Sequence, residues 1–228
     1  MSLERKGFTL WFTGLPCSGK TTLSRAVKAG LVSAGRRVVR LDGDRVRKNL
    51  CRDLGFSKKD RDASAARVAR LASSLTRGGF ATLVSLISPY RRTREAARRL
   101  IGPFIEIYVR CPLSVCEKRD VKGQYRLARL GKIKNFTGIS DPYEEPERPE
   151  IIVDTDRTNV EGCVRKILGS PAVRNALAVN ARTQARLSSL RPGALQNSLW
   201  PRGARPDRSN RRVPNSKDKR RTSRIKGF

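Results

Sequence analysis

The sequence contains no histidine, and that absence removes a whole class of chemistry. None of its 228 residues can supply an imidazole acid, base or metal ligand. Cysteine is sparse, and an odd number of cysteines without a CxxC pair argues against both a disulfide framework and a zinc site. We therefore expect reduced thiols and a cytoplasmic location. The five cysteines are Cys17, Cys51, Cys111, Cys116 and Cys163.

Long apolar runs and acidic residues are also in short supply. No run approaches the roughly 18 apolar residues that a membrane-spanning helix needs. The first seven residues are mostly polar, so we expect no signal peptide and no membrane contact. Lys and Arg number 50 against 20 Asp and Glu, a formal charge of +30. Such a charge favours polyanionic partners and does not determine a fold.

Residues 1–170 alternate between strand-like and helix-like patterns. In residues 59–79, Ala65, Val68, Leu71 and Ala72 recur at helical spacing. Strands that alternate with helices predict an α/β fold, with a mostly parallel sheet covered by helices on both faces. The short β-rich runs are FTLWF at 8–12, RVVRL at 37–41, ATLVSLI at 81–87, FIEIYV at 104–109 and IIVD at 151–154.

Residues 171–228 differ from the rest in composition. They are rich in Arg, Pro, Ser and Asn, and Asp207 and Asp218 are their only acidic residues. With few large apolar residues and no sustained period, this stretch cannot offset the entropy of ordering. We predict one domain over 1–170 and a basic, disordered tail over 171–228.

A phosphate-binding pattern follows the first predicted strand. Gly14-x4-Gly19-Lys20-Thr21 matches the P-loop, and a predicted helix begins at its end. Gly19 allows the backbone to approach phosphate closely, and the loop N–H groups point at the anion. Lys20 adds a positive charge, and the Thr21 hydroxyl can bind Mg²⁺. The same letters occur by chance before ordinary helices, but here the strand and helix context is present.

Two carboxylates, Asp42 and Asp44, directly follow the second predicted strand. Ligands of open parallel sheets bind beyond the carboxyl ends of strands, so both acids would face the phosphates. One could hold Mg²⁺, while the other could orient or deprotonate an attacking hydroxyl. Arg47 could then hold an anionic substrate. Asp-Gly-Asp is also ordinary turn chemistry, and local spacing does not decide between the two interpretations.

Several longer segments together resemble one family. They are GLPCSGKTT, LDGDRVR, DLGFSKKDR, LISPYR, CEKRDVKGQY and KNFTGISDPYEEPERPE, in that order. From about Gly7 to Asp154 the chain resembles adenylylsulfate kinase (APS kinase). The resemblance implies a P-loop kinase that uses ATP and Mg²⁺. Its reaction moves the γ-phosphoryl of ATP to the 3′-hydroxyl of adenosine 5′-phosphosulfate, giving PAPS and ADP.

The resemblance also implies roles for individual residues. Asp44 would lie near the accepting hydroxyl, and Phe56 and Phe136 would enclose the substrate adenine. Ser88 matches a serine described in the family as phosphorylated, although in-line transfer favours a plain substrate contact. Residues 122–136 would form a mobile lid. The full expectation is Lys20, Asp44 and Ser88 for catalysis; Gly14, Cys17, Ser18, Gly19, Lys20, Thr21, Thr22 and Arg119 for ATP; Asp44, Arg47, Phe56, Arg61, Ser64, Ile87, Ser88, Lys122, Asn135 and Phe136 for substrate; and Thr21 and Asp42 for metal.

Five positions depart from the family pattern: Arg45, Ala63, Ser64, Ala66 and Leu86. They bear on substrate affinity more than on reaction type, because the P-loop, the acidic pair and the lid remain. An inactive relative, another small-molecule P-loop kinase and a nucleic-acid-binding protein acting through its tail stay open. A homodimer and unspecific nucleic-acid contact through the tail also stay open as partners, besides the two substrates.

Overall fold

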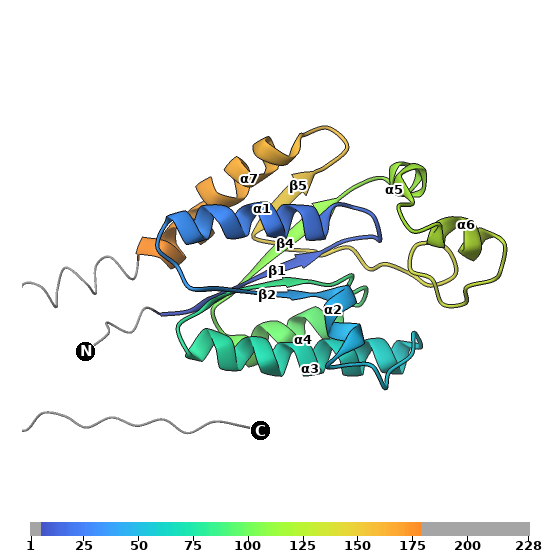
Figure 1. Cartoon of the computed structure of the whole chain (residues 1–228), viewed down its shortest axis with the longest axis horizontal. Coiled ribbons are helices and arrows are strands. Elements are labelled where there is room, and N and C mark those ends of the chain that lie inside the picture. Colours follow the sequence, from blue (N-terminus) through green and yellow to red (C-terminus); the bar gives the residue numbers. More distant parts are fainter. Residues whose placement is uncertain (1–5, 179–228) are drawn as a thin grey trace, which may run out of the picture. The chain divides into compact units, whose positions relative to one another are not determined.

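Five parallel strands form one sheet, in the order β2-β3-β1-β4-β5, in the computed structural model of the chain (Figure 1). The structure describes residues 6–178. All five predicted strands are present, so the α/β prediction is confirmed. Their bounds are β1 (Phe8–Thr13), β2 (Val38–Asp42), β3 (Ala81–Ser85), β4 (Phe104–Arg110) and β5 (Ile151–Asp154).

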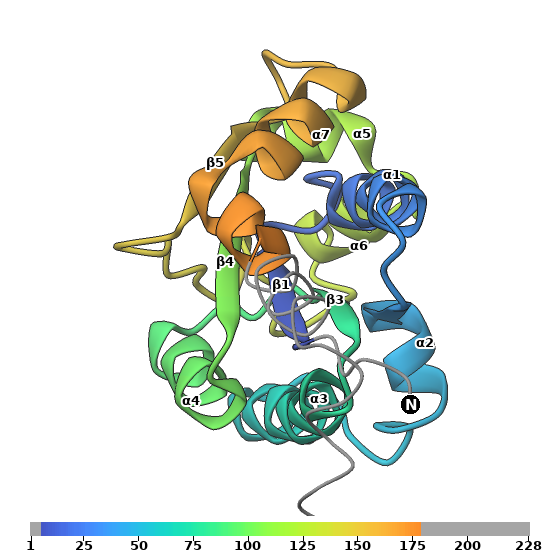
Figure 2. The ribbon, with the colours of Figure 1, turned by 90° about the vertical axis from the view of Figure 1, so that its left-hand side faces the viewer.

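Helices cover both faces of this sheet, as predicted. Helices α1 and α7 pack together on one face, and α3 and α4 pack together on the other (Figures 1 and 2). The helices are α1 (Lys20–Ser33), α2 (Gly43–Lys48), α3 (Lys58–Arg77), α4 (Arg91–Ile101), α5 (Leu113–Arg119), α6 (Gln124–Arg129) and α7 (Val160–Gly169). None of the helices within residues 6–178 is both long and apolar enough to cross a membrane.

Strand β1 divides the core into two layers. Phe8, Leu10 and Phe12 pack with α1 and α7, whereas Trp11 packs with α3 and α4. This is the alternation of a strand buried on both faces. Each of these large side chains contributes about 1.5–3 kcal/mol by leaving water. The central position of β1 therefore fixes the loop that follows it.

Helix α3 confirms most of its predicted apolar face. Ala65, Val68 and Ala72 are buried, but Leu71 is 38% exposed. The predicted helix is confirmed, and Leu71 lies beside the buried stripe rather than within it. The helix begins after Ser57, whose hydroxyl accepts a hydrogen bond from the backbone N–H of Asp60.

The folded part extends beyond the predicted boundary at residue 170. Residues 171–178 are helical, and Val173 is completely buried. Ala172, Ala176 and Leu177 pack against the same cluster as α1 and α7. The predicted disorder is wrong for these eight residues, because the composition of the whole tail concealed a short apolar face at its start. Residues 179–228 of the predicted tail lie outside the described residues.

Candidate active site

The phosphate loop is built from backbone conformations that few side chains tolerate. Gly14 has φ of 149°, and a Cβ there would lie 2.5 Å from the carbonyl oxygen of Val109. Gly19 has φ of 100° and caps helix α1, while Cys17 has φ of 59°. The first N–H groups of α1 have no partner within the helix and face the loop. The loop thus has the strand–loop–helix geometry that binds phosphate.

Lys20 closes the loop by hydrogen bonds from its ammonium group. Nζ donates to the carbonyl oxygens of Gly14 at 2.9 Å and Leu15 at 2.6 Å, and it lies 3.4 Å from Ser18 Oγ. Only 9% of the residue is exposed. Burial lowers the pKa of Lys20 to about 8, because a charged group loses its hydration there. The nearby Asp42 carboxylate partly opposes that shift.

Thr21 and Asp42 meet in front of the loop. Thr21 Oγ1 donates to Asp42 Oδ2 at 2.8 Å, and Asp42 Oδ1 accepts from the N–H of Asp44 at 3.2 Å. Asp42 therefore caps α2 as turn chemistry requires, and it also places an oxygen beside Thr21. Among residues 6–178 no three His, Cys, Asp or Glu side chains gather as metal ligands. Mg²⁺ beside a nucleotide needs only one or two protein oxygens, and Thr21 with Asp42 fits that requirement.

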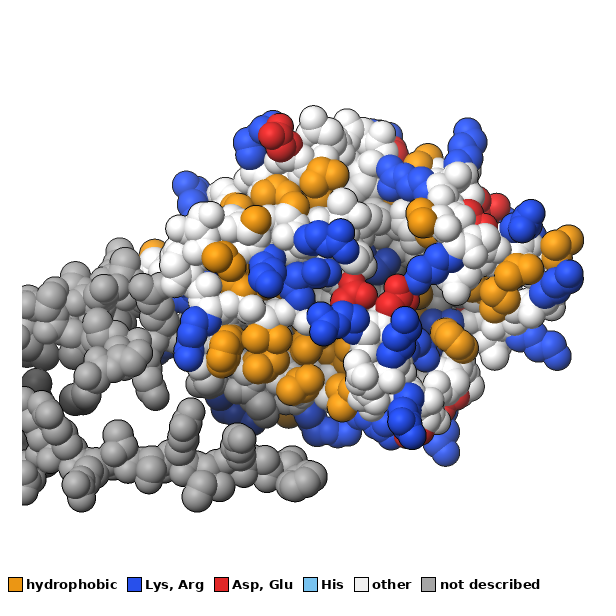
Figure 3. All heavy atoms as spheres, in the orientation of Figure 1, with side chains coloured by type: hydrophobic (Ala, Val, Ile, Leu, Met, Phe, Trp, Pro, Cys, Tyr) orange, Lys and Arg blue, Asp and Glu red, His pale blue; other side chains and the backbone are white. Residues whose placement is uncertain are grey.

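Basic side chains surround the two carboxylates, Asp42 and Asp44. Arg40 Nη2 lies 3.4 Å from Asp42 Oδ2. Burial lowers the pKa of Arg40, and the charges of Arg25 and Arg45 lower it further. Figure 3 shows Lys and Arg side chains gathered on this face, with acidic side chains among them. The face attracts polyanions, and Arg45, one of the departures from the family pattern, adds to that attraction.

Asp44 is paired with the segment that precedes α6. Lys122 Nζ lies 2.5 Å from Asp44 Oδ2, and the two side chains are 54% and 67% exposed. Such an exposed pair contributes about 0–1 kcal/mol, so it opens easily. The structure therefore brings together the predicted acceptor-side acid and the first residue of the predicted lid.

A second group of predicted substrate residues gathers around Phe56. The guanidinium of Arg47 lies 4.1 Å from the centre of the Phe56 ring, and that of Arg61 lies 5.8 Å from it. Arg61 also donates to the backbone oxygen of Asn135 at 2.5 Å. Burial, and then the Arg61 charge, lowers the pKa of Arg47. The 54% exposed Phe56 ring thus lies among basic groups on the acceptor side.

The Phe136 ring is buried, so it offers no exposed face that could stack on a base opposite Phe56. It is 8% exposed and packs edge-to-face on Tyr125, with ring centres 4.9 Å apart. Its backbone N–H donates to Ser140 Oγ at 3.0 Å. The predicted enclosure of adenine by both rings therefore stays a prediction, and it requires Phe136 to leave its packing against Tyr125.

Ser88 turns its hydroxyl into the protein. The residue has φ of 45° and is 5% exposed, and its Oγ accepts a hydrogen bond from Trp11 Nε1 at 3.1 Å. The neighbouring Ile87 carbonyl accepts from Thr13 Oγ1 at 2.7 Å. The turn that carries both predicted substrate contacts is therefore held from below by residues of β1.

Arg119, at the end of α5, is linked to the phosphate loop through Thr155, the residue that follows β5. Its guanidinium donates to the backbone oxygen of Thr155 at 2.6 Å and lies 3.2 Å from Thr155 Oγ1. Thr155 Oγ1 in turn donates to the backbone oxygen of Ser18 at 2.9 Å. Thr155 thus connects the predicted ATP-base residue to the loop. Sequence reasoning did not identify Thr155, because it follows β5 without a recognisable motif.

The remaining departures from the family pattern lie in several environments. Ser64 is 5% exposed on α3, and Leu86 packs beside the cluster that contains Trp11. Ala63 and Ala66 are half-buried. Because Ser64 is buried, a larger polar group at this position would need local movement. Thr22, predicted at the ATP site, is exposed in the first turn of α1.

Known proteins resemble this chain in both sequence and structure. A sequence profile of the adenylylsulphate kinase family matches residues 6–154. The adenylyl-sulfate kinase of Halothermothrix orenii is 54% identical over 165 residues, covering 72% of this chain and 89% of that protein. That of Synechococcus sp. (strain JA-3-3Ab) is 52% identical over 168 residues, covering 74% and 96%.

Solved structures give the same result. The Mycobacterium tuberculosis APS kinase CysC in complex with AMPPNP and APS matches with a TM-score of 0.66 at 35% identity, over 79% of this chain and 99% of that one. A hexameric APS kinase from Thiobacillus denitrificans matches with a TM-score of 0.56 at 37% identity, over 73% of this chain and 29% of that one.

Proposed function

Because this chain belongs to the adenylylsulphate kinase family, we propose that it transfers the γ-phosphoryl of ATP to the 3′-hydroxyl of adenosine 5′-phosphosulfate. The products are PAPS and ADP. The observation that carries the proposal is the meeting of the phosphate loop, Asp42 and Asp44 at the carboxyl ends of β1 and β2. A phosphoryl donor and an acceptor hydroxyl would approach each other there.

The phosphate loop supplies the donor side of the reaction. Its backbone N–H groups and the Lys20 ammonium would bind the β- and γ-phosphates, with Lys20 exchanging its loop carbonyls for phosphate oxygens. Thr21 and Asp42 would hold Mg²⁺, which neutralises phosphate charge when it is bound. Arg119, held by Thr155, would lie against the ATP base. These groups position ATP and stabilise the charge on ADP as it leaves.

Asp44 supplies the acceptor side. Its carboxylate would accept a hydrogen bond from the 3′-hydroxyl and take the proton as the new oxygen–phosphorus bond forms. The bond from the γ-phosphorus to the β–γ bridging oxygen breaks in the same step, and ADP leaves. Arg47 and Arg61 would hold the anionic substrate beside Phe56. Lys122 would leave Asp44 for substrate when the lid closes.

A matched pair of variants tests the proposal. Asp44→Asn keeps the shape of the side chain but cannot take a proton, so turnover should fall by at least about 100-fold. Asp53→Asn is the control, because Asp53 is an exposed acid that pairs with Arg67, outside the groups proposed to bind substrate. Adenylylsulfate-dependent ADP release is the measurement. Near-normal turnover in a folded Asp44→Asn variant would contradict the assignment.

The proposal includes assembly and location. A solved relative is described as hexameric, which supports self-association of this chain, with a homodimer as its smallest form. Light scattering of the purified chain measures that state directly. All five cysteines are free thiols, which supports a cytoplasmic location, and cell fractionation tests it.

A further inference from the structure

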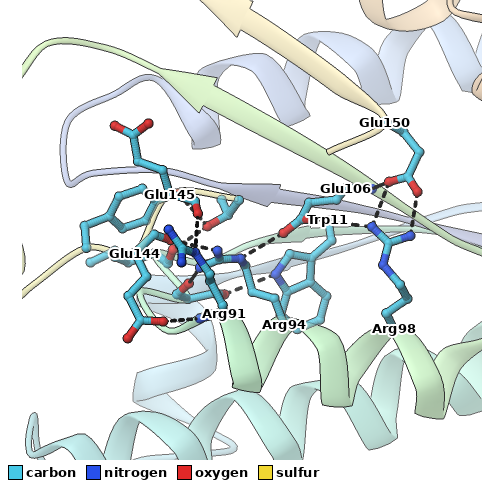
Figure 4. Close-up of polar contacts among 12 residues, drawn as sticks. Trp11, Arg91, Arg94, Arg98, Glu106, Glu144, Glu145 and Glu150 are labelled. Carbon is cyan, nitrogen blue, oxygen red and sulfur yellow. Dashed lines mark hydrogen bonds and ion pairs between the residues drawn. The ribbon is translucent and has the colours of Figure 1, made fainter. Parts of the chain in front are cut away.

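Arg94 is a buried charge that joins three separate parts of the chain. It lies in the first turn of α4 and is 3% exposed. Its Nε donates to Glu106 Oε1 of β4 at 2.8 Å, Nη1 donates to the Ser88 carbonyl at 2.7 Å, and Nη2 donates to the Glu144 carbonyl at 2.7 Å. Figure 4 shows Arg94 with Glu106 and Glu144 near it. Every nitrogen of the guanidinium group therefore donates at least one hydrogen bond.

The Ser88 carbonyl belongs to a turn in an unfavourable conformation. A serine with φ of 45° is costly, by about 1–3 kcal/mol, and persists only where its surroundings impose it. Trp11 donates a hydrogen bond to its hydroxyl, and Arg94 donates one to its carbonyl. Of the two donors, only Arg94 is charged. Because hydrogen bonds from charged groups are the stronger kind, Arg94 contributes more than Trp11 to holding the turn.

The Glu144 carbonyl belongs to the segment that follows the lid. This acidic segment, residues 144–150, runs along α4, where Arg91 pairs with Glu147 and Arg98 pairs with Glu150. The Glu144 backbone N–H also donates to the Pro89 carbonyl at 2.8 Å. Arg94 and this backbone bond therefore tie the Ser88 turn directly to the acidic segment.

We propose that Arg94 is a positioning residue for the acceptor substrate, acting through the Ser88 turn and the acidic segment. The inference rests on the proposed function, and on the expectation from the family resemblance that Ile87 and Ser88 contact adenylylsulfate. Glu106 neutralises Arg94 and orients its fork, so that two nitrogens remain for the two carbonyls. A lysine cannot reproduce this arrangement, because its donors radiate from one nitrogen. The hydrogen bonds of the Arg94 guanidinium go to Glu106, Ser88 and Glu144 rather than to the phosphate loop, so we expect ATP binding to change little without Arg94.

Arg98 provides a matched control one helical turn later. It also lies within reach of Glu106, at 3.4 Å, and it binds Glu150, but it contacts neither Ser88 nor Glu144. Arg98→Met therefore removes a neighbouring arginine of the same network while leaving the Ser88 turn in place. Arg94→Lys keeps the charge, and the double variant Arg94→Met with Glu106→Met avoids an unpaired buried acid if the single change fails to fold.

The experiment measures the two ligands separately, with adenylylsulfate and a non-hydrolysable ATP analogue each titrated by calorimetry. Arg94→Lys should weaken adenylylsulfate binding by at least about ten-fold, since losing a hydrogen bond to a charged group has an effect of that order. Binding of the ATP analogue should change less than about two-fold, and Arg98→Met should change neither ligand by more than that. The double variant should show the same selective loss. Equal losses for both ligands, a selective loss in Arg98→Met, or unchanged binding in Arg94→Lys would each overturn the proposal.

Hydrogen exchange separates this inference from the proposed function. Arg94→Lys should speed amide exchange in residues 86–90 and 141–145, and Arg98→Met should leave both segments protected. If the unmodified chain does not bind adenylylsulfate, the proposed function fails while exchange still reports the positioning. Unchanged exchange at both segments in Arg94→Lys would overturn the positioning itself.

Discussion

Ser88 keeps its hydroxyl against the indole of Trp11, with only 5% of the residue exposed. A nucleophile must reach the γ-phosphorus in line, whereas this hydroxyl is held in the core beneath the turn. Substrate would therefore meet the backbone of the turn more readily than the side chain. The environment of Ser88 therefore supports the plain substrate contact that in-line transfer already favoured over a phosphorylated serine.

The variant Ser88→Ala tests those roles. We expect measurable turnover, with adenylylsulfate affinity lowered several-fold because the turn loses one neutral hydrogen bond of roughly 0.5–1.5 kcal/mol. Trp11→Phe is the matched control, because it removes the same bond from the other partner. The two variants should behave alike in steady-state kinetics. Complete loss of transfer in Ser88→Ala alone would instead indicate a phosphorylated intermediate.

The lowered pKa of Lys20 predicts that nucleotide binding depends on pH. Its pKa of about 8 is below the ordinary value, so the folded chain holds this proton less tightly than the unfolded chain does. The destabilising effect of burying Lys20 is thus largest below pH 8 and fades as pH rises. Phosphate binding requires the protonated form, so affinity for an ATP analogue should fall above about pH 8, by up to about ten-fold per pH unit.

Calorimetry between pH 7 and 9.5 measures this effect. Lys20→Met should bind weakly throughout and lose the dependence, whereas Lys28→Met, an exposed change on the same helix, should keep it. Affinity that stays level across this range in the unmodified chain would show that Lys20 does not titrate there.

At the scale of elements, sequence patterns predicted the strands and the main helices, but not the contacts between side chains from distant segments. The five strands follow from short β-rich runs, α3 follows from helical spacing, and the phosphate loop follows from its glycines and their strand and helix context. Leu71 fits the helical spacing but lies beside the buried stripe, because a spacing rule does not fix where the stripe ends. The contacts of Arg94 could not be predicted, since they join side chains and carbonyls from three distant segments.

The helix over 171–178 gives a prediction at this scale. A chain ending at 178 should be as stable as the full chain, whereas a chain ending at 170 should lose about 2–4 kcal/mol through the lost burial of Val173 and its neighbours. Urea unfolding of the two truncations measures the difference. Equal stability would show that this helix adds nothing to the core.

The whole molecule carries a formal charge of +30, and residues 179–228 hold 14 of its 50 Lys and Arg but only two acidic residues. Removing these residues should leave phosphoryl transfer nearly unchanged, because the family match ends at residue 154. It should also remove most affinity for nucleic acid, and in the full chain that affinity should fall steeply with salt through counterion release. Oligonucleotide binding at two salt concentrations is the measurement. Salt-insensitive binding by the truncated chain would place a nucleic-acid site in the kinase domain.

Acceptor-dependent ADP release by the purified full chain tests the central claim most directly. The reaction holds ATP and Mg²⁺ with either adenylylsulfate or its 3′-deoxy analogue, which keeps the anion and the base but lacks the accepting hydroxyl. We predict ADP together with PAPS in the first reaction and only background ADP in the second. Equal ADP release with the two acceptors, or with none, would contradict the account.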